Sequence, residues 1–240
     1  MTETEITSPS NPQVRQIRRL HTRRERARSA LFIAEGEDLV AAAAAAGRQV
    51  RFGLRLAGSD LGGPGFTDAS ERAMAAASTL GSSTRVIGVY EQQWATPIGD
   101  SVYLHGVRDP GNVGTIMRAA TAFGFSGLVL GPRCADPHGP KCVRASMGAL
   151  FALTLGRGAP AGRTVALDAH RGTPLSELAP APGPTTLLVG AERAGLPDDL
   201  IEGADAVARI PIQTESLNAA MAATVAMYEM TRLSSRVPAS

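Results

Sequence analysis

The stretch DPGNVGTIMRAATAFGF, residues 109–125, decides the fold. It follows a short apolar run, residues 102–107, which has the length and β-branched content of a buried strand. A polar turn then leads to Asn112, a good helix N-cap, and apolar residues recur after it at helical spacing. A second apolar run, residues 128–130, resumes a strand. This order predicts a βαβ unit whose turn lies at the carboxyl edge of a parallel sheet, where open α/β sheets bind ligands.

Taken alone, this stretch is ambiguous, because every βαβ protein has such a turn and Arg118 is then an ordinary solvated helix residue. Two later stretches change the balance. LLVGAERAGLP, residues 187–197, is a buried strand that ends in a glycine-flanked turn containing an acid. IPIQTESLNAAMAATVAMYE, residues 210–229, runs from a strand through a polar loop into a helix of small residues. Together the three stretches predict three polar loops at the strand ends of one sheet.

The rest of the second half continues the alternation of strand and helix. Strands are expected near residues 102–107, 127–131, 151–155, 164–168, 185–190 and 207–212, and helices near residues 113–123, 143–150, 198–203 and 217–233. Such alternation is typical of a mostly parallel sheet that is covered on both faces.

The length of 240 residues allows one large domain or two modest ones. The linker-like composition of residues 95–100 predicts a boundary there, with domains at residues 1–95 and 100–240. No apolar run reaches the roughly 18 residues that a membrane span needs, and the N-terminus is too polar for a secretory signal. We therefore expect a cytoplasmic protein that does not bind membranes.

The two cysteines do not form a disulfide framework. Cys134, His138 and Cys142 have a spacing that resembles a metal site, but Pro137 and Pro140 break the helical geometry that would bring them together. A structural zinc site would also need a fourth ligand. We expect reduced cysteines and no metal.

The N-terminal region carries a local excess of positive charge. Asn11 followed by Pro12 predicts a helix start, and one helix is expected from there to about Arg28. Seven arginines fall in this stretch against a single acid, Glu25. A charge run is most often a solvated helix face. Charges of one sign repel each other, however, so the pattern favours an RNA or DNA backbone as partner. The candidate RNA-binding residues are Asn11, Arg15, Arg18, Arg19, Arg23 and Arg26.

The three loop stretches resemble the three motifs of the SpoU (TrmH-type) branch of the SPOUT RNA methyltransferases. The first ninety or so residues resemble the substrate-binding domain of that family, which has a small ribosomal-protein-like α/β fold. The resemblance implies a C-terminal α/β domain threaded into a deep trefoil knot. It also implies S-adenosylmethionine as cofactor and a homodimer formed through the C-terminal domain. The implied reaction is methyl transfer to a ribose 2'-hydroxyl of RNA.

The resemblance also assigns site residues. The positions that match the catalytic set are Asn112, Arg118, Glu192, Ser216 and Asn218, and those that match cofactor contacts are Leu188, Gly190, Ile210 and Leu217. A guanidinium with a pKa above about 12 is a poor proton acceptor. We therefore expect Arg118 to hold a phosphate and stabilise the developing alkoxide. Each polar residue also has a plain interpretation, as a helix cap or a surface acid, and it is their coincidence in three loops that favours catalysis.

These features point first to a ribose methyltransferase acting on 23S ribosomal RNA. Related alternatives are a tRNA ribose methyltransferase and a ribosomal RNA methyltransferase that confers antibiotic resistance. A different class is an RNA-binding factor that keeps the fold without catalysis. A Rossmann-type dehydrogenase would need GxGxxG after the first strand of the second domain, and the sequence has none there.

Overall fold

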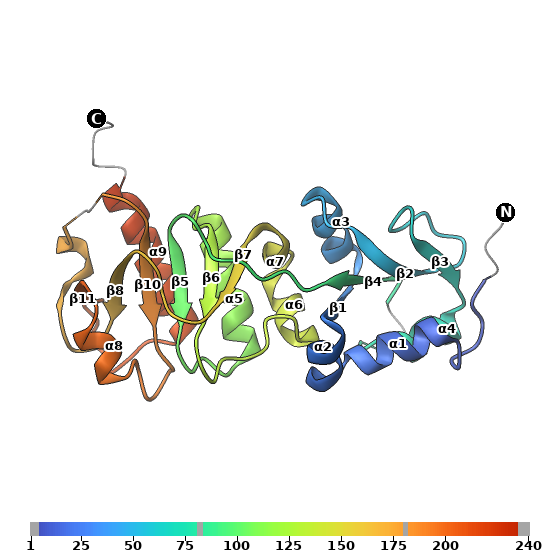
Figure 1. Ribbon diagram of the computed structural model, residues 1–240, viewed down its shortest axis with the longest axis horizontal. Helices are drawn as coiled ribbons and strands as arrows, with labels where there is room; N and C mark the ends of the chain where they lie inside the picture. The colour runs from blue at the N-terminus through green and yellow to red at the C-terminus, as the bar shows by residue number, and fades with distance from the viewer. Residues whose placement is uncertain (1–4, 81–83, 180–181, 235–240) are drawn as a thin grey trace. The chain divides into compact units, whose positions relative to one another are not determined.

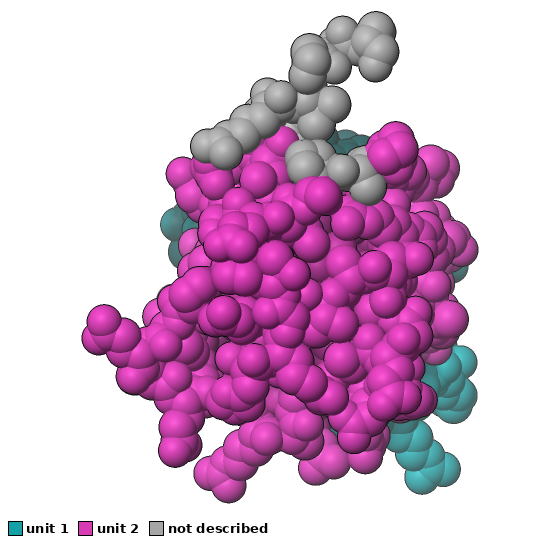
Figure 2. Space-filling view, turned by 90° about the vertical axis from the view of Figure 1, so that its left-hand side faces the viewer, with its two compact units in different colours: residues 1–92, 136–151 teal, residues 93–135, 152–240 magenta. Residues whose placement is uncertain are grey.

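The computed structural model describes residues 5–80, 84–179 and 182–234. The chain divides into two compact units (Figure 2), which are described separately below. The first comprises Met1–Gln92 and Asp136–Phe151, and the second comprises Gln93–Ala135 and Ala152–Ser240. The segment 136–151 falls in the half of the sequence expected to form the second domain, yet it packs within the first unit. The first unit is therefore discontinuous in sequence.

The first unit contains a four-stranded sheet (Figure 1). In spatial order its strands are β1 (Leu31–Glu35), β4 (Val86–Glu91), β2 (Val50–Leu56) and β3 (Phe66–Ala69). β4 is antiparallel to β1 and β2, whereas β3 runs parallel to β2. Strand β3 was not expected, because four residues after a glycine-rich loop give little periodicity. Its Phe66 ring lies so close to Gly53 that a Cβ at the glycine would overlap it.

The helices of the first unit differ from expectation at the N-terminus. They are α1 (Pro12–Leu20), α2 (Arg23–Ser29), α3 (Glu37–Ala45), α4 (Glu71–Ala77) and α6 (Pro140–Ser146), and α7 (Ala149–Ala152) ends at the boundary with the second unit. The prediction of a single helix from Asn11 to Arg28 is wrong. Thr22 caps a new helix by accepting a hydrogen bond from the Glu25 amide. Asn11 caps α1, accepting from the Gln13 amide at 2.8 Å.

The core of the first unit forms around the apolar side of α1. Val14, Ile17 and Leu20 are fully buried and pack in one cluster with strand residues such as Leu54 and Ile87. Burial of this apolar side leaves the arginines of α1 on its outer side.

The second unit contains a sheet of seven parallel strands. Its order is β7 (Thr154–Arg157), β6 (Gly127–Leu130), β5 (Ser101–Leu104), β10 (Thr185–Val189), β8 (Arg163–Leu167), β11 (Ala206–Arg209) and β9 (Thr173–Pro174). Every pair of neighbouring strands is parallel. The expected α/β class and parallel sheet are therefore confirmed.

Helices cover both faces of this sheet. Leu188, Tyr103 and Val129 share one face and pack against Ile201 of α8 (Asp198–Glu202). Because side chains alternate along a strand, the buried Leu187 faces the other side, where α9 (Ala219–Ser234) contacts β10. The remaining elements are α5 (Pro110–Ala122), which packs against α9, and the short helix η1 (Leu175–Glu177).

Most strands end earlier than expected, which lengthens the loops at the carboxyl edge. The strand expected at residues 151–155 is wrong in its bounds, because residues 149–152 form α7 and β7 ends at Arg157. β5 stops at Leu104 and β11 at Arg209, so residues 105–109 and 210–218 are loops. The cap of α5 is Asp109, whose carboxylate accepts from the Asn112 amide at 2.9 Å. The expected cap, Asn112, lies instead in the first turn of the helix, and its side chain is available for other contacts.

Candidate functional site

The three loop stretches meet through one network of side-chain amides. The Asn112 amide nitrogen donates to a Glu192 carboxylate oxygen, and the Asn112 amide oxygen accepts from the Asn218 amide nitrogen at 3.1 Å. The Asn218 oxygen in turn accepts from the backbone amides of Ala220 and Met221, at 2.9 and 3.3 Å. Only one orientation of each amide satisfies all of these bonds, so the network has a defined direction. It ties the start of α5, the loop after β10 and the start of α9 together.

The loop after β10 is held by its own backbone. Ala191 and Gly195 exchange two hydrogen bonds, from Ala191 N to Gly195 O at 3.2 Å and from Gly195 N to Ala191 O at 2.9 Å. This closes a tight loop against Gly190, where a Cβ would overlap the backbone of Gly195 and Leu196. Glycine at this position is therefore a packing requirement. Glu192 and Arg193 are exposed at the tip of the loop.

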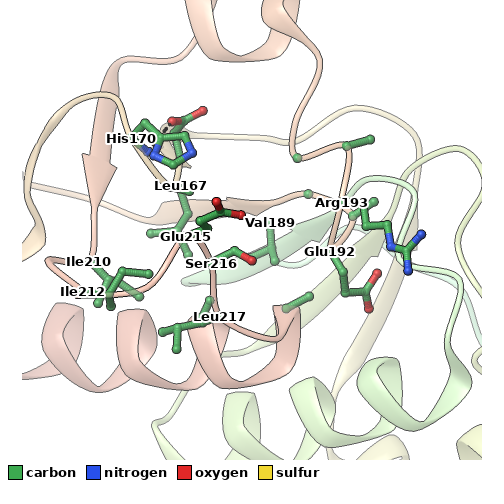
Figure 3. A pocket seen from close by; sticks show the side chains of 18 residues that line it. Leu167, His170, Val189, Glu192, Arg193, Ile210, Ile212, Glu215, Ser216 and Leu217 are labelled. Carbon is green, nitrogen blue, oxygen red and sulfur yellow. Dashed lines mark hydrogen bonds between the residues drawn. The ribbon is translucent and has the colours of Figure 1, made fainter.

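A cavity of about 470 Å³ lies beside this loop (Figure 3). Its walls come from the ends of β8 and β10 and from the loop that leads into α9. The apolar lining residues are Leu167, Val189, Ile210, Ile212 and Leu217, and the polar ones include Asp168, His170, Glu192, Glu215 and Ser216. The volume and the mixed lining are typical of a small-molecule site.

Five of the nine site residues predicted in this unit line the cavity. They are Gly190, Ile210, Leu217, Glu192 and Ser216. Figure 3 shows Glu192 at one side of the cavity and Ile210 at the other. Asn112 and Asn218 are outside the lining but join Glu192 through the amide network.

Leu188 and Arg118 lie elsewhere. Leu188 is 1% exposed in the core cluster with Tyr103, and its neighbour Val189 lines the cavity instead. Arg118 is exposed on α5 and, within the described ranges of the chain, makes no hydrogen bond or ion pair and is absent from the cavity lining. It lies six positions after Asn112, which is about 9 Å further along the helix and on a different face.

Sequence reasoning missed the loop after β8. The Asp168 carboxylate accepts from the backbone amides of His170 and Arg171, each at 2.8 Å. Burial opposes ionisation of Asp168, but these hydrogen bonds and the nearby Arg171 guanidinium outweigh it and lower the carboxyl pKa. Asp168 is therefore an anionic group in the lining at neutral pH. An acid at the end of a predicted strand, on the same edge as the other loops, was an available signal.

The arginines of the first unit fall into two groups. Arg15, Arg18, Arg19 and Arg23 are exposed, as a nucleic-acid surface requires. Arg26 does not fit the prediction of an exposed RNA-binding residue. Its side chain is only 6% exposed and forms an ion pair with Asp136 at 2.8 Å. It also donates to the backbone oxygens of Leu20 and His21. Arg26 therefore joins α2 to the segment 136–151 and has no free face for RNA.

Among the residues that the structure describes, no group of three or more His, Cys, Asp and Glu side chains is arranged to hold a metal ion. Within the same residues, no helix has both the length and the apolar character that crossing a membrane requires.

A parallel sheet with a ligand-sized cavity at its carboxyl edge defines an α/β protein that binds a small molecule there. Residues 101–228, more than half of the chain, match the SpoU rRNA Methylase family, and residues 11–92 match the MRM3-like substrate binding domain. The chain therefore belongs to the SpoU rRNA methylase family.

Individual relatives agree with this membership. The chain is 30% identical to the 23S rRNA (guanosine(2553)-2'-O)-methyltransferase RlmP of Bacillus subtilis, over 94% of this chain and 98% of that one. It is 37% identical to a 23S rRNA (uridine(2479)-2'-O)-methyltransferase of Streptomyces viridochromogenes, over 51% of this chain and 49% of the relative. The structure of an AdoMet-bound rRNA methyltransferase from Sinorhizobium meliloti superposes with a TM-score of 0.84 and 31% identity, covering 95% of this chain and 97% of that one.

Proposed function

We propose that this protein transfers the methyl group of S-adenosylmethionine to a ribose 2'-hydroxyl of 23S ribosomal RNA. The observation that carries the proposal is the amide network of Asn112, Glu192 and Asn218, which joins the three family motifs beside one cavity. Two relatives act on 23S rRNA, one at a guanosine and one at a uridine. Ribose is what these substrates share, so the base is left open.

The cavity fits the cofactor in size and chemistry. Adenine needs an apolar slot with backbone donors and acceptors, which Ile210, Leu217 and the tight turn at Gly190 supply. The carboxylates of Asp168 and Glu215 suit the ribose hydroxyls and the ammonium group. When bound, the cofactor supplies a methyl group that its sulfonium charge has already activated.

The chain's own residues position the RNA and stabilise charge. Ser216, which is exposed at the cavity wall, and Asn218 are assigned to hold the target ribose and the loops around it. Glu192 accepts from Asn112, which supports a role in ordering the loops. Arg118 is assigned to clamp a phosphate next to the target hydroxyl and to stabilise negative charge on its oxygen as the proton leaves.

A homodimer accounts for the position of Arg118. It is exposed and outside the cavity of its own chain, so we propose that it serves the cavity of a second copy. The same side of the unit has an apolar strip on α9, formed by Met221, Val225 and Tyr228, which are 60%, 43% and 55% exposed. Their spacing places them on one face of the helix, which suits burial against a second copy. The trefoil knot is part of this proposal and rests on family membership.

The first unit is proposed to hold the RNA outside the catalytic centre. The match to a substrate binding domain and the exposed arginines Arg15, Arg18, Arg19 and Arg23 support this role. A cytoplasmic location, where ribosomal RNA is available as substrate, is part of the proposal.

Methyl transfer to purified RNA tests the function directly. The chain is incubated with labelled S-adenosylmethionine and either ribosomal RNA or tRNA from cells that lack the gene, and the methylated nucleotide is mapped. We expect one ribose-methylated position in 23S rRNA. Methylation of tRNA alone, or tight cofactor binding without methyl transfer to any RNA, would replace the proposal with one of the alternatives.

Arg118→Ala tests the role of the arginine. It should reduce methyl transfer by at least about a hundredfold, as loss of one charge-stabilising group does, while cofactor affinity changes little. Thr115→Ala, exposed on the same helix, is the matched control and should keep wild-type activity. Wild-type turnover of the Arg118 variant would end this assignment.

A further inference from the structure

Four arginines of the second unit follow four neighbouring strands at the edge that carries the cavity. β10, β5, β6 and β7 lie side by side (Figure 1). Their last rows are in register, with Val189 beside Leu104, Leu104 beside Leu130, and Leu130 beside Arg157. Each strand has an arginine at or after its carboxyl end. Arg193 follows β10, Arg108 follows β5, Arg133 follows β6, and Arg157 is the last residue of β7.

All four side chains are exposed and leave their charge uncompensated. In the described part of the chain, none of the four forms an ion pair with an acid. The acids of the same loops are engaged elsewhere, since Glu192 accepts from Asn112 and Asp109 caps α5. With neighbouring strands about 4.8 Å apart, the row from β10 to β7 spans roughly 14 Å. Such a row of like charge repels itself unless an anion lies along it.

Arg133 is held in place by the structure. Its backbone has φ of 60°, a conformation that few residues other than glycine adopt. Backbone hydrogen bonds from Gly106 to Pro132 and from Ala135 to Val107 fix the loop on both sides, at 3.0 and 2.9 Å. The Arg133 guanidinium donates to the His105 ring nitrogen at 3.1 Å. A strained backbone that is supported in this way occurs where a side chain must be positioned.

Arg157, the last arginine of the row, stacks on the ring of Trp94. Its guanidinium lies 3.7 Å from the centre of the Trp94 ring, and the arginine itself is exposed. A guanidinium plane backed by an aromatic ring is a surface on which a nucleic acid base stacks. The edge therefore offers cations for phosphates and, at its far end, a platform for a base.

We propose that the carboxyl edge of the second unit is a path for single-stranded RNA, leading from the cavity at Arg193 past Arg108 and Arg133 to a base-stacking platform at Arg157 and Trp94. This rests on the proposed function and adds to it how the strand next to the target nucleotide is held. The path supplies contacts that need no particular base sequence, which suits an unpaired strand beside the target nucleotide.

The test uses the full chain and two single-stranded probes, a 12-residue oligoadenylate and a 12-residue oligouridylate. A triple variant, Arg108→Ala with Arg133→Ala and Arg157→Ala, is compared with a control triple variant, Arg72→Ala with Arg85→Ala and Arg163→Ala. The control removes the same charge from exposed or half-exposed positions that are not at the carboxyl ends of these four strands. Arg108 and Arg133 are the two phosphate contacts that the first variant removes. At about 0.7 for each contact, the slope of log K against log salt should fall by about 1.4. The control slope should match wild type, and equal slopes for the two triple variants would overturn the path.

Arg157→Lys separates stacking from charge. It keeps the positive charge but loses the planar group, so the salt slope should be unchanged while oligoadenylate binds at least about fivefold more weakly. Unchanged oligoadenylate affinity would remove the platform from the proposal. Methyl transfer by the wild-type chain is assayed in parallel. If methyl transfer is absent, the proposed function is refuted, and the salt slopes alone then decide whether the edge binds RNA. If methyl transfer is intact and the two triple variants have equal slopes, only the RNA path is refuted.

Discussion

Exchanging the two sides of the Asn112–Glu192 hydrogen bond tests the network on which the site depends. Asn112→Asp replaces the amide donor with a second carboxylate facing Glu192, while it can still accept from Asn218. Glu192→Gln supplies a donor on the other side. The single Asn112→Asp change should therefore destabilise the second unit, and the double variant should restore the bond with its polarity reversed.

The size of the effect follows from the contacts. A hydrogen bond to a charged group contributes about 1.5 to 3 kcal/mol, and the lower end applies because both side chains are partly or fully exposed. Two carboxylates about 4 Å apart in water repel by about 1 kcal/mol. The N-terminus of α5 favours a negative charge by about 0.3 to 1 kcal/mol, which opposes these losses. We expect a net cost of about 1 to 2 kcal/mol for Asn112→Asp, at least half of it recovered in the double variant.

Urea unfolding measures this, because the single tryptophan, Trp94, lies in the second unit and reports on it by fluorescence. Thr115→Asp adds the same charge to α5 at an exposed position without facing Glu192, and should cost little. Methyl transfer should follow stability, falling in the single variant and returning in the double one. An Asn112→Asp chain as stable as wild type, or a double variant that loses the sum of both single effects, would refute the network as described.

Two further predictions concern the turn at Gly190 and the acid response of the first unit. Gly190→Ala puts a Cβ into the backbone of Gly195, so the loop must shift. We expect the free energy of unfolding to fall by about 1 to 3 kcal/mol and cofactor binding, measured by calorimetry, to weaken. Ala194→Ser in the same exposed loop should change neither quantity. Glu35 is 4% exposed; burial would raise its pKa, but hydrogen bonds from Ser78, Thr79 and Thr84 lower it below its ordinary 4.5. The unfolded state then binds the proton more readily, so this stabilisation is complete above about pH 4.5 and is lost as the pH falls further. Unfolding in acid is followed by circular dichroism, and the stability of Glu35→Gln should fall less steeply with decreasing pH than that of the wild type. The same dependence on pH in both proteins would count against this account.

The sequence predicted the cavity from local patterns combined with one geometric rule. Each loop, as at Gly190 or Ser216, follows a strand, and the carboxyl ends of parallel strands share one edge. The N-cap of α5 was predicted at the wrong residue because Asp109 and Asn112 are both good caps. Pro110, which favours the first helical position, decides for Asp109. The break between α1 and α2 also had a signal, since Thr22 and Glu25 have the spacing of a capping box.

Other features depend on contacts that no local pattern carries. The partner of Arg26 is Asp136, 110 positions away, so a buried arginine looked like a member of an exposed stripe. The packing of the segment 136–151 in the first unit is equally non-local. Phe32 of β1 has its ring centre 4.7 Å from that of His138 and 5.9 Å from that of Phe151. Alternating strands and helices predict a layered sheet, but they do not predict which unit a connecting segment joins.

The amide network explains why each motif was weak evidence alone while the three together were strong. Asn218 caps α9 with its oxygen and donates to Asn112, which in turn donates to Glu192, so each side chain fixes the orientation of the next. Removing Asn112 frees an acceptor of Glu192 and a donor of Asn218, whereas removing Glu192 or Asn218 frees one group of Asn112. Asn112 is an ordinary first-turn residue when only α5 is considered, and Glu192 is an ordinary surface acid when only its loop is considered. The hydrogen bonds between them exist only in the assembled edge, where the order of the strands brings the three loops into contact.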